Sequence, residues 1–208
     1  MTTFLNARRH AFLPTGLGFS RERSGMAAVE FSFILPVALL IMSLVVYGGQ
    51  VYSVQRKVTL SAMTVADIFA QGNNTGAASI TTAELNQILS YPNLILFPND
   101  PTAVQVFLYQ LSVTSSSGTT TGTVKGRWAN ANGTPNLLPC GQQMPVDPSI
   151  AAAFTGASTS YVVMGEVYYP FQPTGFYVSL GAMTLHDSIM MIPRTAAQIQ
   201  VQGTPSCP

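Results

Sequence analysis

The chain has 208 residues, with nine Lys or Arg, eight Asp or Glu and two His, so its formal net charge is +1. This length accommodates one domain of moderate size plus an anchor. The absence of a basic tract excludes nucleic acid as a partner. Only 8% of the residues are charged and 47% are hydrophobic, which favours an exported or membrane-associated protein over a cytosolic enzyme.

Residues 1–25 predict a basic cytoplasmic leader, because they hold four arginines against one glutamate and show no apolar periodicity. Three kinds of processing stay open for this leader. A secretory signal would be cut just beyond the apolar run, where Tyr47–Gln50 is a poor small-x-small site. A mitochondrial transit peptide fits the Arg-rich composition but needs no spanning segment directly after it. Cleavage after Gly25 would leave the apolar segment in the mature protein.

The stretch from Gly25 to Tyr52 is the strongest signal in the chain. Glu30 is its one charged residue, and the next charge is Arg56. About 20 apolar residues of helix cross the hydrocarbon core of a bilayer, so the run predicts a single membrane span. The basic leader and the acidic excess after Lys57 place the N-terminus in the cytoplasm and the C-terminal part across the membrane. Arg56 and Lys57 themselves weaken this bias.

Residues 26–71 predict one long helix with two different halves. Pro36 in the first half removes one backbone hydrogen bond and is expected to kink the helix. Beyond Gly48 and Gly49 the pattern becomes amphipathic, and this half is expected to pack on a soluble domain or on neighbouring helices. Its apolar stripe recurs at three- and four-residue steps: Val51, Val54, Val58, Ala62, Val65 and Phe69.

Residues 72–208 predict an exported α+β domain. Thr81 and Glu84 form a capping box that starts a second helix, and Tyr91 with Pro92 is expected to end it. The whole chain is therefore predicted to be α+β, with the transmembrane and amphipathic helix packed on an antiparallel sheet.

The sheet is predicted from β-branched and aromatic runs bounded by turn residues. The expected strands are residues 104–113, 123–129, 160–169 and 183–192, with Pro170 ending the third and a turn at Asn132–Gly133. Residues 115–122 are expected to be a flexible polar loop, and residues 135–159 a long loop with a short helix near 148–154.

The two cysteines, Cys140 and Cys207, are candidates for one disulfide if the C-terminal part lies outside the cytoplasm. Such a bond would tie the C-terminus to a central loop and stabilise the fold by about 4 kcal/mol on loop-entropy grounds. The alternative is two free, buried thiols.

The sequence contains no catalytic constellation. Nucleophile-elbow, Walker A and dinucleotide motifs are missing, and one histidine with two cysteines at these spacings makes no zinc site. No metal and no cofactor is therefore expected. His186, Asp187 and Ser188 suggest a triad, but neighbours along a strand point to opposite faces and do not easily converge. A pocket holding Glu166 and Asp187 together would favour an exported enzyme.

Glu30 has two interpretations. In the first turn of a helix, a carboxylate is favoured by the helix dipole by up to about 1 kcal/mol. Alternatively, cleavage after Gly25 would make Met26 a free α-amine, and Glu30 would accept the amine of an adjacent subunit within the membrane.

The heptapeptide from Gly25 to Phe31 resembles the processing site of type IV prepilins, which have Gly before the cut and Glu at the fifth mature position. More narrowly, Arg21 to Tyr52 resembles the start of the TadE-like family, pseudopilins of the tight-adherence, Flp-type pilus system. The residues that carry this resemblance, in order, are Ala27, Ala28, Val29, Glu30, Phe31, Pro36, Gly48 and Tyr52.

The resemblance implies that an inner-membrane prepilin peptidase cuts after Gly25, recognising Gly25, Met26, Glu30 and Phe31. It implies a minor pseudopilin without enzymatic activity, anchored in the bacterial inner membrane with a periplasmic domain and partnered by lipid and by other pilins and pseudopilins. Glu30 and Pro36 would act in assembly. A domain much larger than that of a major Flp pilin suggests a subunit that initiates, caps or regulates the fibre, at its base or tip.

One alternative keeps the same anchor. An uncleaved single-pass protein would use its exported domain to bind a surface, glycan or peptidoglycan, or to brace a secretion complex. The Ser/Thr-rich segment at 115–123 would be its contact surface, although an unstructured linker is the favoured interpretation of that segment.

Overall fold

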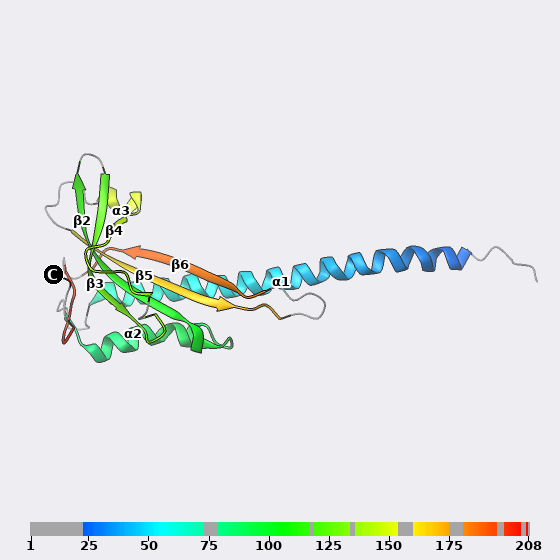
Figure 1. Ribbon diagram of the computed structural model, residues 1–208, viewed down its shortest axis with the longest axis horizontal. Helices are drawn as coiled ribbons and strands as arrows, with labels where there is room; N and C mark the ends of the chain where they lie inside the picture. The colour runs from blue at the N-terminus through cyan, green and yellow to red at the C-terminus, as the bar shows by residue number, and fades with distance from the viewer. Residues whose placement is uncertain are drawn as a thin grey trace, which may run out of the picture. The chain divides into compact units, whose positions relative to one another are not determined.

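The computed structural model describes residues 23–72, 79–116, 119–133, 136–153, 160–174, 181–194, 198–204 and 207. The chain divides into two compact units, Met1–Met42 and Ser43–Pro208. The predicted α+β class is confirmed (Figure 1). The elements are α1 (Arg23–Gln71), β1 (Ser79–Ile80), α2 (Thr82–Ile95), the 3-10 helix η1 (Pro101–Ala103), β2 (Gln105–Ser116), β3 (Thr119–Ala129), β4 (Gln143–Pro145), α3 (Pro148–Ala153), β5 (Ser160–Phe171), β6 (Met183–Met191) and β7 (Gln200–Val201).

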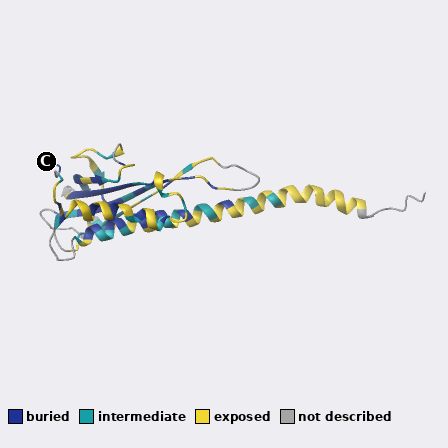
Figure 2. Cartoon of the chain, turned by 90° about the horizontal axis from the view of Figure 1, so that it is seen from below, coloured by how far each residue is buried: buried dark blue, intermediate teal, exposed yellow. Residues whose placement is uncertain are grey.

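α1 confirms the predicted long helix and is continuous through Pro36, Gly48 and Gly49. From residue 25 to residue 42 all residues except the intermediate Leu39 are exposed, and Figure 2 shows this stretch mainly in yellow. Among the described residues it is the one helix long and apolar enough to cross a membrane. The leader predicted for residues 1–25 lies almost entirely outside the described residues.

The second unit is built on a five-stranded sheet in the order β4-β3-β2-β5-β6, with every neighbouring pair antiparallel. β2 and β5 form its centre, where Val106 pairs with Val167 and Val113 with Ser160. β1 and β7 form a separate parallel pair.

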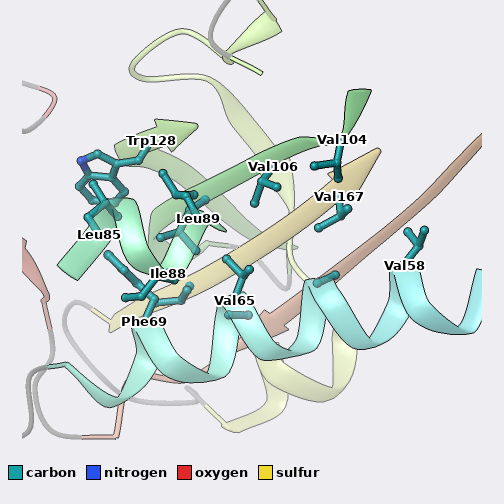
Figure 3. Close-up of a cluster of buried hydrophobic side chains, with 14 of the residues drawn as sticks. Val58, Val65, Phe69, Leu85, Ile88, Leu89, Val104, Val106, Trp128 and Val167 are labelled. Atoms are coloured by element: carbon teal, nitrogen blue, oxygen red, sulfur yellow. The ribbon is translucent and has the colours of Figure 1, made fainter. Parts of the chain in front are cut away.

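One face of the sheet packs against the second half of α1 and against α2 (Figure 3). The predicted apolar stripe supplies this contact: Val54, Val58, Ala62, Val65 and Phe69 are buried, and Val51 packs against them in part. The structure thus decides between the two expected partners of the stripe, because the chain's own domain covers it. α2 adds Leu85, Ile88 and Leu89.

The opposite face of the sheet has a second apolar layer. Phe107, Tyr109 and Met164 are buried there, and the segment after β3 covers them with Leu137 and Leu138. Both faces of the central strands are therefore covered by apolar side chains. For this reason β2 and β5 carry near-continuous apolar runs and do not alternate strictly between apolar and polar residues.

Two proline predictions were wrong. α2 continues through Pro92 to Ile95. Pro92 removes one hydrogen bond from the helix, but the following turn is kept, since Leu96 N–H donates to Pro92 O at 2.9 Å. β5 continues through Pro170 to Phe171. β2 pairs with β5 only as far as Tyr168, so Pro170 removes no hydrogen bond with β2.

Two loop predictions were also wrong. Most of the segment 115–122 is strand, since β2 and β3 form a hairpin in which Ser116 pairs with Thr119 and Thr114 with Thr121. Threonine is β-branched and suits a paired strand. β4 lies within the predicted loop 135–159, whereas α3 matches the short helix predicted there.

Candidate functional site

The residues of the predicted processing site lie within residues 23–31, the first nine of α1. Gly25, Met26, Glu30 and Phe31 are all exposed, with Met26 and Phe31 at 68% and 62%. Within the described part of the chain, Glu30 makes no hydrogen bond and no ion pair. Its carboxylate is therefore available to a group from another molecule, and the two interpretations of Glu30 stay open.

The second half of α1 is held on the domain by polar contacts as well as by its apolar stripe. The Gln50 amide donates to Thr174 O at 3.0 Å and accepts from Thr174 N–H at 3.2 Å. Near the end of α1, Arg194 Nη2 lies 2.5 Å from Asp67 Oδ1. Further contacts run from Thr59 to the Asp187 carboxylate, from Gln55 to His186 O and from Lys57 to Phe97 O.

The same contacts protect the outer edge of the sheet. β6 is the last strand, and an unpaired edge strand invites pairing with another chain. Gln55 of α1 donates to His186 O at 3.1 Å, and the Asp187 carboxylate accepts from Ser188 N–H at 2.9 Å. These hydrogen bonds engage His186 O and Ser188 N–H, two backbone groups of β6 with which an added strand would otherwise pair.

α1 approaches the sheet closely at Gly165 of β5. A Cβ at this position would lie 2.8 Å from Ala62 O and 3.0 Å from Ala66 Cβ. Both alanines are fully buried. The glycine and the two alanines therefore set the distance between the helix and the sheet.

The suggested triad of His186, Asp187 and Ser188 does not form. The His186 ring stacks on Tyr168 with centroids 4.1 Å apart, whereas Asp187 accepts a hydrogen bond from Thr59 of α1. Asp187 pairs with Val167, the neighbour of Glu166 along β5, so Glu166 and Asp187 point to opposite faces of the sheet. Glu166 and Asp187 therefore do not share a pocket, which was the arrangement expected to favour an exported enzyme.

Glu166 instead belongs to a cluster on the sheet face opposite α1. Its Oε1 accepts from the Tyr168 hydroxyl and lies 2.8 Å from His186 Nε2. Burial first, and the Glu166 carboxylate second, raise the pKa of Tyr168 to about 12. Tyr168 therefore stays a neutral hydrogen-bond donor to Glu166 throughout the physiological range.

Sequence reasoning treated Glu166 only as a possible partner of Asp187 and missed its actual neighbours. Glu166 and Tyr168 stand two apart in a strand and must share a face, so this half of the cluster was visible in the sequence. His186 joins it through the register that pairs Tyr168 with His186, which no local pattern gives.

The two cysteines meet beside β3. Cys140 and Cys207 lie at disulfide-bonding distance, with Cα atoms 5.4 Å apart and 67 positions between them in sequence. Cys207 N–H donates to Lys125 O at 3.0 Å, and the neighbouring Gly141 N–H donates to Val124 O at 3.0 Å. The geometry supports the expected pairing and makes it a specific target for a thiol assay.

Comparison with known proteins identifies a family match near the N-terminus. Residues 25–67 match the family described as TadE-like protein, which confirms the resemblance of this segment and covers about a fifth of the chain. No curated protein and no solved structure matches. The match and the apolar helix together indicate a membrane-anchored protein associated with a Tad pilus.

Proposed function

We propose that this chain, TadE-like over residues 25–67, is a minor pseudopilin or assembly component of a Tad/Flp-type pilus. α1 anchors it in the inner membrane with the C-terminal domain in the periplasm. A prepilin peptidase cuts between Gly25 and Met26, and the product acts in pilus biogenesis and surface adherence without enzymatic activity. Its partners are the peptidase, membrane lipid and other pilins and pseudopilins.

The observation that carries this proposal is that the family match coincides with one uninterrupted helix. The match spans 25–67 and α1 spans Arg23–Gln71. One end of α1 carries the residues that resemble a processing site, and the other end supplies Val65 and Phe69 to the domain core. Cleavage after Gly25 would leave this whole helix in the mature subunit.

The apolar stripe of α1 is buried against the chain's own domain, so a different surface of α1 is available to neighbouring subunits. The apolar stripe is used internally, but Tyr52, Leu60 and Met63 are 68%, 52% and 44% exposed. With Arg56 and Lys57 they line a groove of about 600 Å³. In the proposed assembly, this outer surface contacts neighbouring helices.

The alternative is an uncleaved, single-pass protein whose exported domain binds a surface or braces a secretion complex. The β2–β3 hairpin favours this alternative more than the sequence did. Its Ser/Thr-rich residues pair as strands. They therefore form a two-stranded β-ribbon and not the unstructured linker favoured for residues 115–123.

The N-terminal sequence of the protein purified from bacterial membranes tests the proposal. We expect it to begin at Met26, which retains α1 and supports prepilin-type processing. A start at Met1 would favour the uncleaved anchor. A start beyond Gly49 would mean an ordinary signal peptide and would contradict both.

Glu30→Ala is expected to leave membrane insertion intact and to impair piliation, because the apolar span is unchanged while the acceptor for a neighbouring α-amine is lost. Membrane fractionation and pilus counts by electron microscopy measure the two effects. Glu22→Ala is the matched control, since that carboxylate would leave with the leader. Normal piliation by the Glu30 variant would refute the amine-pairing role.

A further inference from the structure

A cavity lies on the sheet face opposite α1, between β2, β5 and the segment that follows β3. Its volume is about 440 Å³, within the range of roughly 300–1,000 Å³ typical of small-ligand sites. Pilus assembly through α1 makes no use of it. Its wall combines aromatic rings with one carboxylate.

The aromatic wall comes from adjacent strands in fixed geometry. Phe107 and Tyr109 of β2 stack with centroids 6.2 Å apart, and Phe107 meets Tyr168 of β5 edge-to-face at 5.7 Å. Phe107 and Tyr109 are almost fully buried, so the partly buried Tyr168 offers the most accessible ring, with the His186 ring stacked on one of its faces. Ring faces carry negative potential and attract cations.

The carboxylate of Glu166 lines the same cavity, and its side chain is only 14% exposed. Oε1 takes the contacts to Tyr168 and His186, whereas Oε2 accepts no hydrogen bond within the described part of the chain. A carboxylate that is mostly removed from water interacts favourably with a partner of positive charge. His186 is such a partner only when it is protonated.

Basic side chains lie beside the cavity and not in its described wall. Among the described lining residues there is no Lys or Arg. The nearby Arg127 donates from Nη1 to Leu138 O at 2.9 Å, which fixes the segment over the cavity. The remaining polar groups of the wall are the neutral amides of Gln105 and Asn136.

We propose that this cavity binds an organic cation, an alkylammonium group that sits against Tyr168 and pairs with Glu166. An ammonium group satisfies both features at once, because aromatic faces and a carboxylate each favour positive charge. A neutral sugar would stack on the rings and donate hydroxyl hydrogen bonds to the carboxylate, but it would supply no positive charge to balance it. The site goes beyond the proposed function and does not depend on it.

The test uses the full chain in an uncharged detergent with ¹³C-labelled methionine methyl groups. Met144 lines the cavity, and its signal is assigned with Met144→Leu. Tetramethylammonium and N-acetyl-lysine methylamide are titrated in turn. We expect a saturable shift of the Met144 signal, with no shift for methyl glucoside.

Two variants assign the shift to the site. Glu166→Gln is expected to weaken binding about tenfold or more, the size of a lost charge-assisted contact, and Tyr168→Leu to weaken it several-fold. Asp187→Asn is the matched control, because it removes the same charge one strand away on the opposite face, and it should leave the affinity unchanged. Thermal unfolding verifies that each variant is folded.

Either ammonium probe binding in a Glu166-dependent way supports the site, and tighter binding of the lysine derivative points to a polypeptide partner rather than a free small cation. The proposal is overturned if neither probe shifts Met144, if Asp187→Asn weakens binding as much as Glu166→Gln, or if methyl glucoside binds and the ammonium probes do not.

Discussion

Removal of the Cys140–Cys207 link is expected to lower the free energy of unfolding of the C-terminal domain by about 4 kcal/mol, because the bond closes a long loop in the unfolded chain. The sequence separation of the two cysteines is 67. Within that loop lie β4, α3, β5, β6 and β7, so the crosslink encloses three of the five strands of the sheet. Local contacts add to this effect, since Cys207 is buried beside Phe107 and Val124.

The measurement is urea unfolding of the full chain in detergent, followed by the fluorescence of Trp128. This is the chain's one tryptophan, and it lies 5.2 Å from Phe69 of α1, so it reports helix–sheet packing. Cys140→Ala with Cys207→Ala should unfold at lower urea and be insensitive to reductant, whereas reductant should destabilise the wild type. Thiols that react freely in the native wild type would contradict the pairing.

Local patterns in the sequence predicted the helices well. The capping box at Thr81 and Glu84 forms as expected, with Glu84 N–H donating to Thr81 Oγ1 and Thr81 N–H to Glu84 Oε2. The stripe from Val54 to Phe69 is buried as its spacing predicts. Both features depend on residues within one or two turns of each other, which is the range that a sequence pattern describes.

Features that depend on pairing register could not be predicted in the same way. β4 has three residues and no apolar pattern, and it exists because Gly122 of β3 pairs with Met144. The paired residues of β1 and β7 are 121 positions apart (200 − 79), and the two strands meet in parallel. The cluster of Glu166, Tyr168 and His186 likewise requires the β5–β6 register.

The segment 115–122 shows why composition alone misled. Ser, Thr and Gly without apolar residues suggest a solvated loop, yet the hairpin continues β2 and β3 beyond the part of the sheet that β5 covers. Once Leu111–Val124 and the pairs beyond the register shift at Gln110 align the two strands, backbone pairing and β-branched threonines extend the ribbon.

Gly165→Leu is expected to cost about 3 kcal/mol or more, the upper end for overpacking, because the new side chain would enter the contact between α1 and β5. The first Cβ alone would stand 2.8 Å from Ala62 O. That oxygen belongs to the helix backbone, so rotation of a side chain cannot relieve the contact. The helix and the sheet would have to separate along the buried stripe.

Urea unfolding monitored at Trp128 measures this loss, and Gly181→Leu is the matched control, because nothing lies within 4 Å of a Cβ at that glycine. Ala66→Gly should not rescue the Gly165 variant, since it removes one close atom and leaves Ala62 O in place. If Gly165→Leu were as stable as the wild type, α1 would not rest on β5 at this point. The buried stripe would then be free for neighbouring subunits, and the outer surface at Tyr52, Leu60 and Met63 would lose its proposed role in assembly.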